Sequence, residues 1–406
     1  MSVHTAGETP DTCVVVPTIR EYECVREYVA NAREYGHADR LLFVLVTEDF
    51  CDADAMRAML DDLDVAGVVF DESDRHDWYA EHGIGDYDHV VPAASHAQTS
   101  FGLLYLWAHD FEFGFFIDDD TLPHGTDFFG GHYRNLSYEG SITQVRSADD
   151  EERWVNVLHQ NFDEHGLYPR GYPYAAMGGG HESETVDLAR GDVVASQGLW
   201  TNVPDLDAVR ILMDGDLQGQ AQTRTTAADY GEDFLVAPGH YTTVCSMNLA
   251  FRREVVPAFY QLPMDDNGWD VGRFDDIWSG VFLKRAADVL GKRVLTGTPL
   301  CEHNKAPRST FDDLNNEVPA LELNEHVWEV VDDVGGDADT FRGAFAAMAD
   351  ALADGGFEAW TNSDFLTFVG EHMRDWLDCL DALDAGRPVP SAAAPAVAET
   401  GGEADD

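Results

Sequence analysis

Basic residues are scarce in this chain of 406 residues. Lys and Arg together number 25 against 76 Asp and Glu, which gives a formal net charge of −51, and the only lysines are Lys284, Lys292 and Lys305. So acidic a surface repels the phosphates of nucleic acids and of anionic membranes, and we expect neither as a partner. Self-repulsion of this size destabilises a compact state unless salt screens it. The composition is therefore typical of a salt-adapted (halophilic) protein from a salt-loaded cell.

Long apolar runs and paired cysteines are also missing. No apolar stretch approaches the length that crosses a membrane, and residues 1–10 are polar without an apolar signal region. The six cysteines are scattered along the chain and form no Cys-x-x-Cys pair, which is typical of reduced thiols. We expect a cytoplasmic protein without membrane insertion, and a homo-oligomer is left open.

The chain nevertheless has ample material for a folded core, since 44% of its residues are hydrophobic and 11% are aromatic. In its first third, short apolar runs alternate with helix-length segments, which predicts βαβ units and a mostly parallel sheet. The expected strands are Val14–Thr18, Leu41–Val46 and Gly67–Asp71, and the expected helices are Glu21–Tyr35, Ala53–Leu63 and His96–His109. No glycine-rich dinucleotide fingerprint follows the first strand and no P-loop is present, which argues against a nicotinamide-dependent or ATP-driven enzyme.

The later part of the chain is less regular. We expect strands at Gly140–Arg146, Thr242–Phe251 and Arg293–Thr298, a loop at Leu167–Glu184, a helix from Gly272 to Leu290, and amphipathic helices beyond Leu314. The expected organisation is a flexible N-terminus (1–12), an α/β domain (13–315), a helical C-terminal region (316–385) and a disordered acidic tail (386–406).

The stretch Gly114–Pro123 carries the clearest chemical signal. The apolar run Phe115–Ile117 stops at Asp118, Asp119 and Asp120, and ligands of open α/β sheets collect where such strands end. In an extended chain Asp118 and Asp120 would point the same way and could share one hard cation. An acidic chain also produces aspartate triplets by chance, so that alternative stays open here.

Other polar residues follow strands that should end at the same rim. Thr18, Arg20 and Asp49 are expected to gather beside the aspartates. Further along, Asp275 and Asp276 stand in the first turn of an expected helix, where the helix dipole alone favours carboxylates. His303 and Lys305 follow a later strand, and a lone histidine is more often structural than a ligand.

Seven short motifs, in the same order and at similar spacing across about Val14–Trp328, resemble the reversibly glycosylated polypeptides, a family that includes UDP-arabinopyranose mutases. The motifs are Val15–Arg20, Ile117–Asp120, Arg170–Pro173, Gly198–Ala208, Met247–Phe251, Gly272–Trp278 and His303–Ala306. The resemblance implies an α/β fold like that of GT-A glycosyltransferases, with a mostly parallel Rossmann-like sheet and a helical C-terminal region. It also implies a UDP-sugar as substrate and a divalent metal, Mn²⁺ or Mg²⁺, as cofactor.

The resemblance further implies roles for individual residues. Arg170 matches the arginine that becomes reversibly glycosylated, and arginine needs a nearby carboxylate as proton acceptor to act as a nucleophile, for which Asp275 or Asp276 is the candidate. The expected metal ligands are Asp118, Asp120 and His303, and the expected substrate contacts are Thr18, Arg20, Asp49, Asp119, Trp200, Arg273 and Lys305.

The chain also departs from the family pattern. A second arginine that follows the glycosylated one in plant members has no counterpart in Ala175–Gly180, a basic residue is missing at Gln98–Ser100, and the C-terminal helical region differs. Three functions therefore stay open: a UDP-sugar pyranose–furanose mutase with a self-glycosylating arginine, a metal-dependent glycosyltransferase with a nucleotide-sugar donor, and a non-catalytic nucleotide-sugar-binding subunit.

The charge of −51 generates a prediction about stability. Diluting potassium chloride from molar to millimolar concentration should lower the melting temperature, because the repulsion among surface carboxylates is then no longer screened. Thermal unfolding followed by circular dichroism at each salt concentration measures this. A melting temperature that stays constant over the series would contradict the salt-adapted interpretation.

Overall fold

The structure is a computed structural model that describes residues 9–19, 23–149, 151, 153–161, 166–264 and 267–386. Four earlier expectations fall partly or wholly outside these residues: the flexible N-terminus, Arg20, the start of the helix expected from Glu21, and the tail beyond residue 386. Within the described ranges, no helix is long and apolar enough to cross a membrane.

The first part of the chain forms the parallel half of one large sheet. Strands β1 (Thr12–Pro17), β2 (Leu41–Val46), β3 (Gly67–Phe70) and β4 (Phe113–Ile117) lie in the order β3-β2-β1-β4, and each pair is parallel. Strands β1, β2 and β4 are almost wholly buried, as expected for near-continuous apolar runs with helices on both faces. The predicted strands and their parallel order are therefore confirmed in this region.

Helices connect these strands. They are α1 (Cys24–Tyr35), α2 (Ala53–Asp62), α3 (Glu72–Glu81) and α4 (Thr99–Ala108). Helix α3 was not predicted, because its sequence is mostly polar. The Asp71 side chain accepts a hydrogen bond from Asp74 N, and the Asp74 side chain accepts one from Asp71 N. This capping box starts a helix that the apolar pattern does not mark.

The rest of the sheet is mixed. Strand β10 (Asn248–Arg252) runs antiparallel to β4 and to β8 (Val193–Asn202), whereas β11 (Arg293–His303) is parallel to β8. The sheet continues through β9 (Phe234–Val236), β6 (Gly140–Ser147) and β7 (His181–Leu188), and β5 (Thr121–Pro123) pairs with β11. Three expectations need correction: β11 is longer than predicted, β10 starts later, and β7 begins inside the predicted loop.

Close packing fixes β4 against β10. At Gly114 an added Cβ would lie 2.4 Å from the Phe251 ring, so only glycine fits there. His132 on α5 (Phe128–Leu136) is fully buried, 2.9 Å from Ser196 Oγ and 2.9 Å from Asn248 Oδ1. Burial lowers the pKa of His132 to about 4, so the ring is neutral at physiological pH. These contacts place the end of β4 in a rigid setting.

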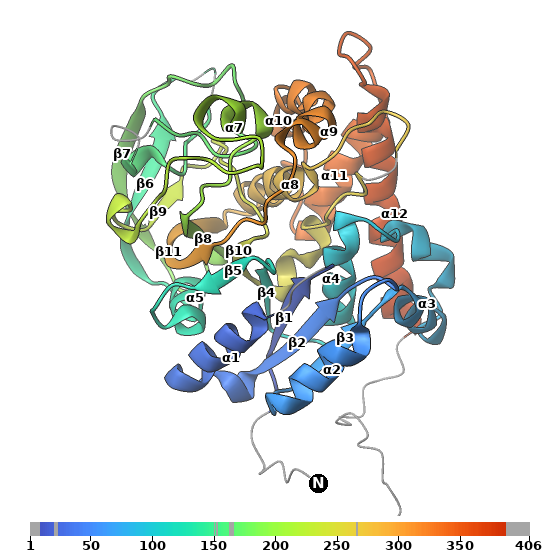
Figure 1. The fold of residues 1–406 in the computed structure, drawn as a ribbon. Coiled ribbons are helices and arrows are strands. Elements are labelled where there is room, and N and C mark those ends of the chain that lie inside the picture. Colours follow the sequence, from blue (N-terminus) through green and yellow to red (C-terminus); the bar gives the residue numbers. More distant parts are fainter. Residues whose placement is uncertain are drawn as a thin grey trace, which may run out of the picture.

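The C-terminal third is helical. Its helices are α8 (Asp275–Val289), α9 (Thr310–Asn324), α10 (Val327–Asp332), α11 (Phe341–Ala353) and α12 (Asp364–Gly386), and α7 (Ala208–Asp214) precedes them. Figure 1 shows α11 and α12 side by side on the flank that also carries α4. The expected boundary at residues 315 and 316 falls inside α9, and the division into domains stays a prediction. The predicted α/β class with a helical C-terminal region is confirmed.

Candidate active site

A cavity of about 350 Å³ opens at the carboxyl ends of β1 and β4. Its wall comes from distant parts of the chain: the end of β1, the turn after β4, the segment around residue 170, the start of α8 and the segment after β11. Ten of the residues singled out from the sequence line it: Thr18, Asp118, Asp119, Asp120, Arg170, Arg273, Asp275, Asp276, His303 and Lys305. The motifs that are scattered in the sequence thus meet in one site.

The aspartate triplet forms a turn and not the end of a strand. Strand β4 ends at Ile117 and β5 begins at Thr121, so the side-chain alternation expected for an extended chain does not apply. All three carboxylates nevertheless line the cavity. Asp119 Oδ2 accepts a hydrogen bond of 2.8 Å from Thr18 Oγ1, which ties the turn to the end of β1.

Asp118 and Asp120 offer oxygen ligands beside an imidazole nitrogen. Burial, then repulsion from Asp120, Asp276 and other carboxylates, raises the pKa of Asp118 well above its usual value, so a cation is what would keep it ionised here. His303 Nδ1 donates to the Val203 carbonyl over 2.7 Å, which leaves a lone pair on Nε2, 3.7 Å from Asp120 Oδ1.

The chemistry of this donor set fits a hard divalent cation. Its geometry is not yet that of a bound metal, since no group of three or more His, Cys, Asp or Glu in the described ranges is arranged to hold one. The assignment of Asp118, Asp120 and His303 as metal ligands therefore stays a prediction.

Arg170 is held by two carboxylates on opposite sides of its guanidinium. Its Nε donates to Asp205 Oδ2 over 3.1 Å, and Nη1 and Nη2 donate to the two oxygens of Asp276, each over 3.1 Å. Nη1 also donates to the Arg273 carbonyl. Burial alone would lower the pKa of Arg170, but Asp205 and Asp276 outweigh it and raise that pKa well above its usual value.

The local backbone brings Arg170 to this position. Gly171 has a φ of +86°, and an added Cβ would lie 2.3 Å from Ile277 on α8. Only glycine permits both this left-handed conformation and this approach to the helix that carries Asp276. The Arg170 N–H donates to the Asp205 carbonyl over 2.9 Å, which fixes the same segment to the loop before α7.

Asp205 was not predicted as a site residue. It is buried, and although burial by itself raises the pKa of a carboxyl, Arg170 and Lys305 lower that of Asp205 to about 2. The sequence does place Asp205 in the Gly198–Ala208 motif, which was the available signal. Nothing in the sequence indicated which of the acidic residues in that motif would face an arginine.

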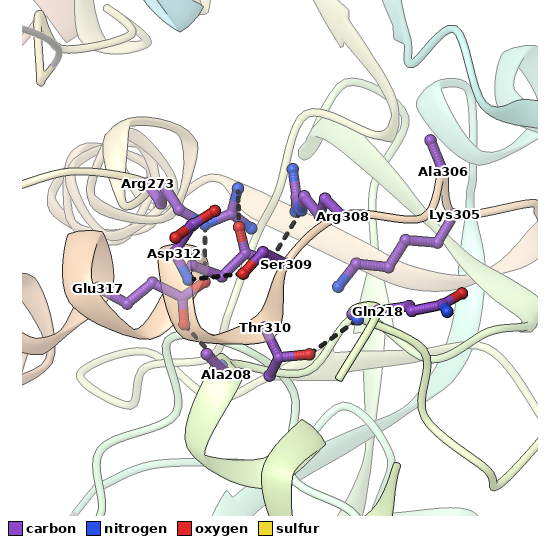
Figure 2. Close-up of polar contacts among 12 residues, drawn as sticks. Ala208, Gln218, Arg273, Lys305, Ala306, Arg308, Ser309, Thr310, Asp312 and Glu317 are labelled. Carbon is purple, nitrogen blue, oxygen red and sulfur yellow. Dashed lines mark hydrogen bonds and ion pairs between the residues drawn. The ribbon is translucent and has the colours of Figure 1, made fainter. Parts of the chain in front are cut away.

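Helix α9 supports the site through the carboxylate of Glu317. Glu317 is 1% exposed; its Oε1 accepts from Arg273 Nε over 2.7 Å and its Oε2 from the Ala208 N–H over 2.6 Å. Figure 2 shows Glu317 between these two partners. The backbone of Arg273 has a φ of +64°, which is rare for a residue other than glycine. The Glu317 contacts therefore help to hold the backbone whose carbonyl receives Arg170.

Lys305 is the one lysine of this cavity. It is 7% exposed, and within the described residues its ammonium makes no hydrogen bond or ion pair. Burial lowers the pKa of Lys305, and the Asp205 charge offsets part of that shift. Arg308 lines the cavity nearby on the same segment, as Figure 2 shows, and is paired with Asp313 over 2.8 Å. A buried ammonium of this kind favours an anionic ligand.

Two predicted substrate contacts do not reach the cavity. Asp49 accepts hydrogen bonds from Ser73 N and Oγ, over 3.1 and 3.2 Å, and does not line the wall; its neighbours Glu48 and Phe50 do. Trp200 is buried in β8, away from the cavity lining. The prediction for Asp49 assumed that a residue next to a strand end faces the site, whereas that for Trp200 came from the resemblance of the Gly198–Ala208 motif.

Comparison with protein families gives one match that spans most of the chain. Residues 101–385 match the family model described as reversibly glycosylated polypeptide. A probable UDP-arabinopyranose mutase 1 of Zea mays is 28% identical over 282 residues, 67% of this chain and 68% of the relative. UDP-arabinopyranose mutase 1 of Arabidopsis thaliana is 34% identical over 176 residues, 43% of each chain.

Solved structures give weaker matches. A mannosyltransferase from Pyrobaculum calidifontis in complex with GDP-Man and Mn²⁺ is 16% identical, over 93% of this chain and 86% of that one, with a TM-score of 0.35. Glucosyl-3-phosphoglycerate synthase from Mycobacterium tuberculosis is 11% identical, over 78% and 80%, with a TM-score of 0.32. At these scores the likeness carries no argument.

Removal of the buried carboxylate on α9 tests its supporting role. Glu317→Ala should lower the free energy of unfolding by about 3–5 kcal/mol, because it leaves the Arg273 guanidinium, whose side chain is only 13% exposed, without its close partner. Urea unfolding at fixed salt measures this. Glu322→Ala, an exposed position on the same helix, is the control and should change stability by less than about 0.5 kcal/mol. Equal losses in the two variants would contradict the assigned role.

Proposed function

Since this chain belongs to the reversibly glycosylated polypeptide family, we propose that it is a UDP-sugar pyranose–furanose mutase that carries the sugar transiently on Arg170. One observation carries the proposal: Arg170 lies in the wall of the cavity that holds the aspartate triplet, with the Asp276 carboxylate against its Nη1 and Nη2. The names of the relatives, UDP-arabinopyranose mutases, support the same activity. The acidic composition supports a cytoplasmic protein from a salt-loaded cell.

The residues that line the cavity include both carboxylates and cations. Asp118, Asp120 and His303 would hold a divalent cation, Mn²⁺ or Mg²⁺, which when bound supplies neutralisation of the charge on the departing diphosphate. Lys305, which also lines the cavity, would supply a further positive charge for the diphosphate. Thr18 keeps the aspartate turn in place through Asp119.

In the proposed reaction, the bond from the anomeric carbon to the diphosphate breaks as the sugar is captured by Arg170. The ring then opens and closes through another hydroxyl, and UDP attacks the anomeric carbon again to release Arg170. Each step exchanges one bond for another, so the conversion of pyranose to furanose needs no oxidant or reductant. Asp276 is placed to take the proton that Arg170 must lose.

A glycosyltransferase that passes the sugar to a separate acceptor is the second candidate. The observation that favours it is the firm hold on Arg170, since a guanidinium paired with Asp205 and Asp276 stays protonated and is a poor nucleophile. In that case Arg170 would bind the diphosphate. A non-catalytic binding subunit is less well supported, because such a protein needs neither the aspartate triplet nor the paired arginine.

Metal removal tests the role of Asp118 and Asp120. Treatment with EDTA should slow turnover on the order of a thousandfold, because the charge on the departing diphosphate is then not neutralised. Turnover is measured by chromatography of the nucleotide sugars, and Mn²⁺ or Mg²⁺ added in excess should restore it. Full activity of protein shown to be metal-free would contradict the proposed cofactor.

Labelling separates the mutase from the transferase. Radiolabelled UDP-arabinopyranose should leave label on the protein, excess UDP should remove it, and UDP-arabinofuranose should appear in solution. Arg170→Lys keeps the positive charge but replaces the planar guanidinium by an ammonium, so it should abolish labelling. Arg285→Lys is the control, because that guanidinium donates to the Val334 carbonyl away from the cavity. Free UDP together with sugar on an added acceptor, and no label on the wild type, would favour the transferase.

A further inference from the structure

One N–H group of the Arg170 guanidinium has no hydrogen-bond acceptor among the described residues. A protonated guanidinium has five N–H groups, one on Nε and two on each Nη. The Nε hydrogen goes to Asp205, and Nη1 uses both of its hydrogens on Asp276 Oδ1 and the Arg273 carbonyl. Nη2 donates once, to Asp276 Oδ2. Within the described residues, the fifth N–H, on Nη2, has no partner.

Resting on the proposed function, we infer that Nη2 of Arg170 is the nitrogen that bonds to the sugar, with Asp276 as the catalytic proton acceptor and Asp205 as the positioning residue. In this step the bond from Nη2 to the anomeric carbon forms, and the bond from that carbon to the diphosphate oxygen breaks. The electron pair of the broken bond leaves with UDP. The proton that Nη2 shares with Asp276 Oδ2 moves to that oxygen, and the return step reverses each change.

Asp276 and Asp205 bind different nitrogens of the Arg170 guanidinium. Asp276 bonds both Nη atoms, so it lies next to the nitrogen that must lose a proton, whereas no such contact joins Asp275 to Arg170. Asp205 bonds Nε at the other end of the group, and its carbonyl also accepts the Arg170 backbone N–H. Two bonds to one residue fix both the backbone and the plane of the guanidinium.

The surroundings of Asp205 suit a positioning role. It is 6% exposed, on the loop just before α7, whose first turn is tied to α9 by the bond from Ala208 N to Glu317. A carboxylate in such a setting has little freedom to follow a moving guanidinium. Without it, Arg170 keeps its bonds to Asp276 but can pivot about them, and a small misplacement of an attacking atom costs much of the rate.

The test measures the rate of protein labelling by radiolabelled UDP-sugar together with the Kd for UDP in the presence of Mn²⁺, on the full chain. Asp205→Asn should slow labelling by about tenfold or more while the Kd for UDP changes by less than about threefold. Asp276→Asn should abolish labelling. Asp332→Asn is the matched control, because Asp332 is a buried carboxylate paired with Arg153 over 2.6 Å outside the cavity lining.

A second readout locates the sugar. Fragmentation of the labelled peptide in a mass spectrometer should place it on a terminal guanidinium nitrogen and not on Nε. Should Asp205→Asn not fold, Asp205→Glu keeps the charge one methylene further out and should label slowly with an unchanged Kd. Sugar on Nε, or labelling of a folded Asp205 variant at the wild-type rate, would overturn this inference alone. A wild-type protein that takes up no label would overturn the proposed function and this inference with it.

Discussion

The ion pairs of Arg170 hold the candidate active site together. Asp205 is 35 residues away in the sequence and Asp276 is 106 residues away, yet both carboxylates meet one guanidinium. Each pair joins a different element to the segment of Arg170: the loop before α7 on one side and the first turn of α8 on the other. Asp205 and Asp276 are buried and only 12% of the Arg170 side chain is exposed, so loss of one partner would leave a poorly solvated charge.

The arrangement of charge is unusual for so acidic a chain. Carboxylates far outnumber cations in the sequence, whereas seven carboxylate residues line the cavity together with four cations, Arg170, Arg273, Lys305 and Arg308. One of the three lysines of the whole chain lies there. An acidic surface repels anions in general, but the cations of this cavity favour an anion with a bound cation, in agreement with the nucleotide diphosphate of the proposed function.

Much of the fold followed from the sequence. The strands β1, β2 and β4 were predicted because parallel strands buried on both faces are short runs of apolar residues with clear ends. Helix α3 and the start of β7 were missed, because a capping box and hydrogen bonds to β6 decide them and the apolar pattern does not. The boundary placed at residue 315 falls within one helix, α9, whose Asp313 and Glu317 lie on either side of it and bind Arg308 and Arg273.

For the site, the sequence alone indicated most of the charged residues that line the cavity. The apolar run that ends at Asp118 marked the aspartate triplet, which is a local property of the chain, and the resemblance to the family motifs marked Arg170 and Asp276. Only the tertiary structure decided that Asp205 and Glu317 hold this arrangement and that Asp49 and Trp200 lie outside it. The physical reason is that the direction of a side chain and the partner of a buried charge depend on contacts between segments far apart in sequence, which no local pattern encodes.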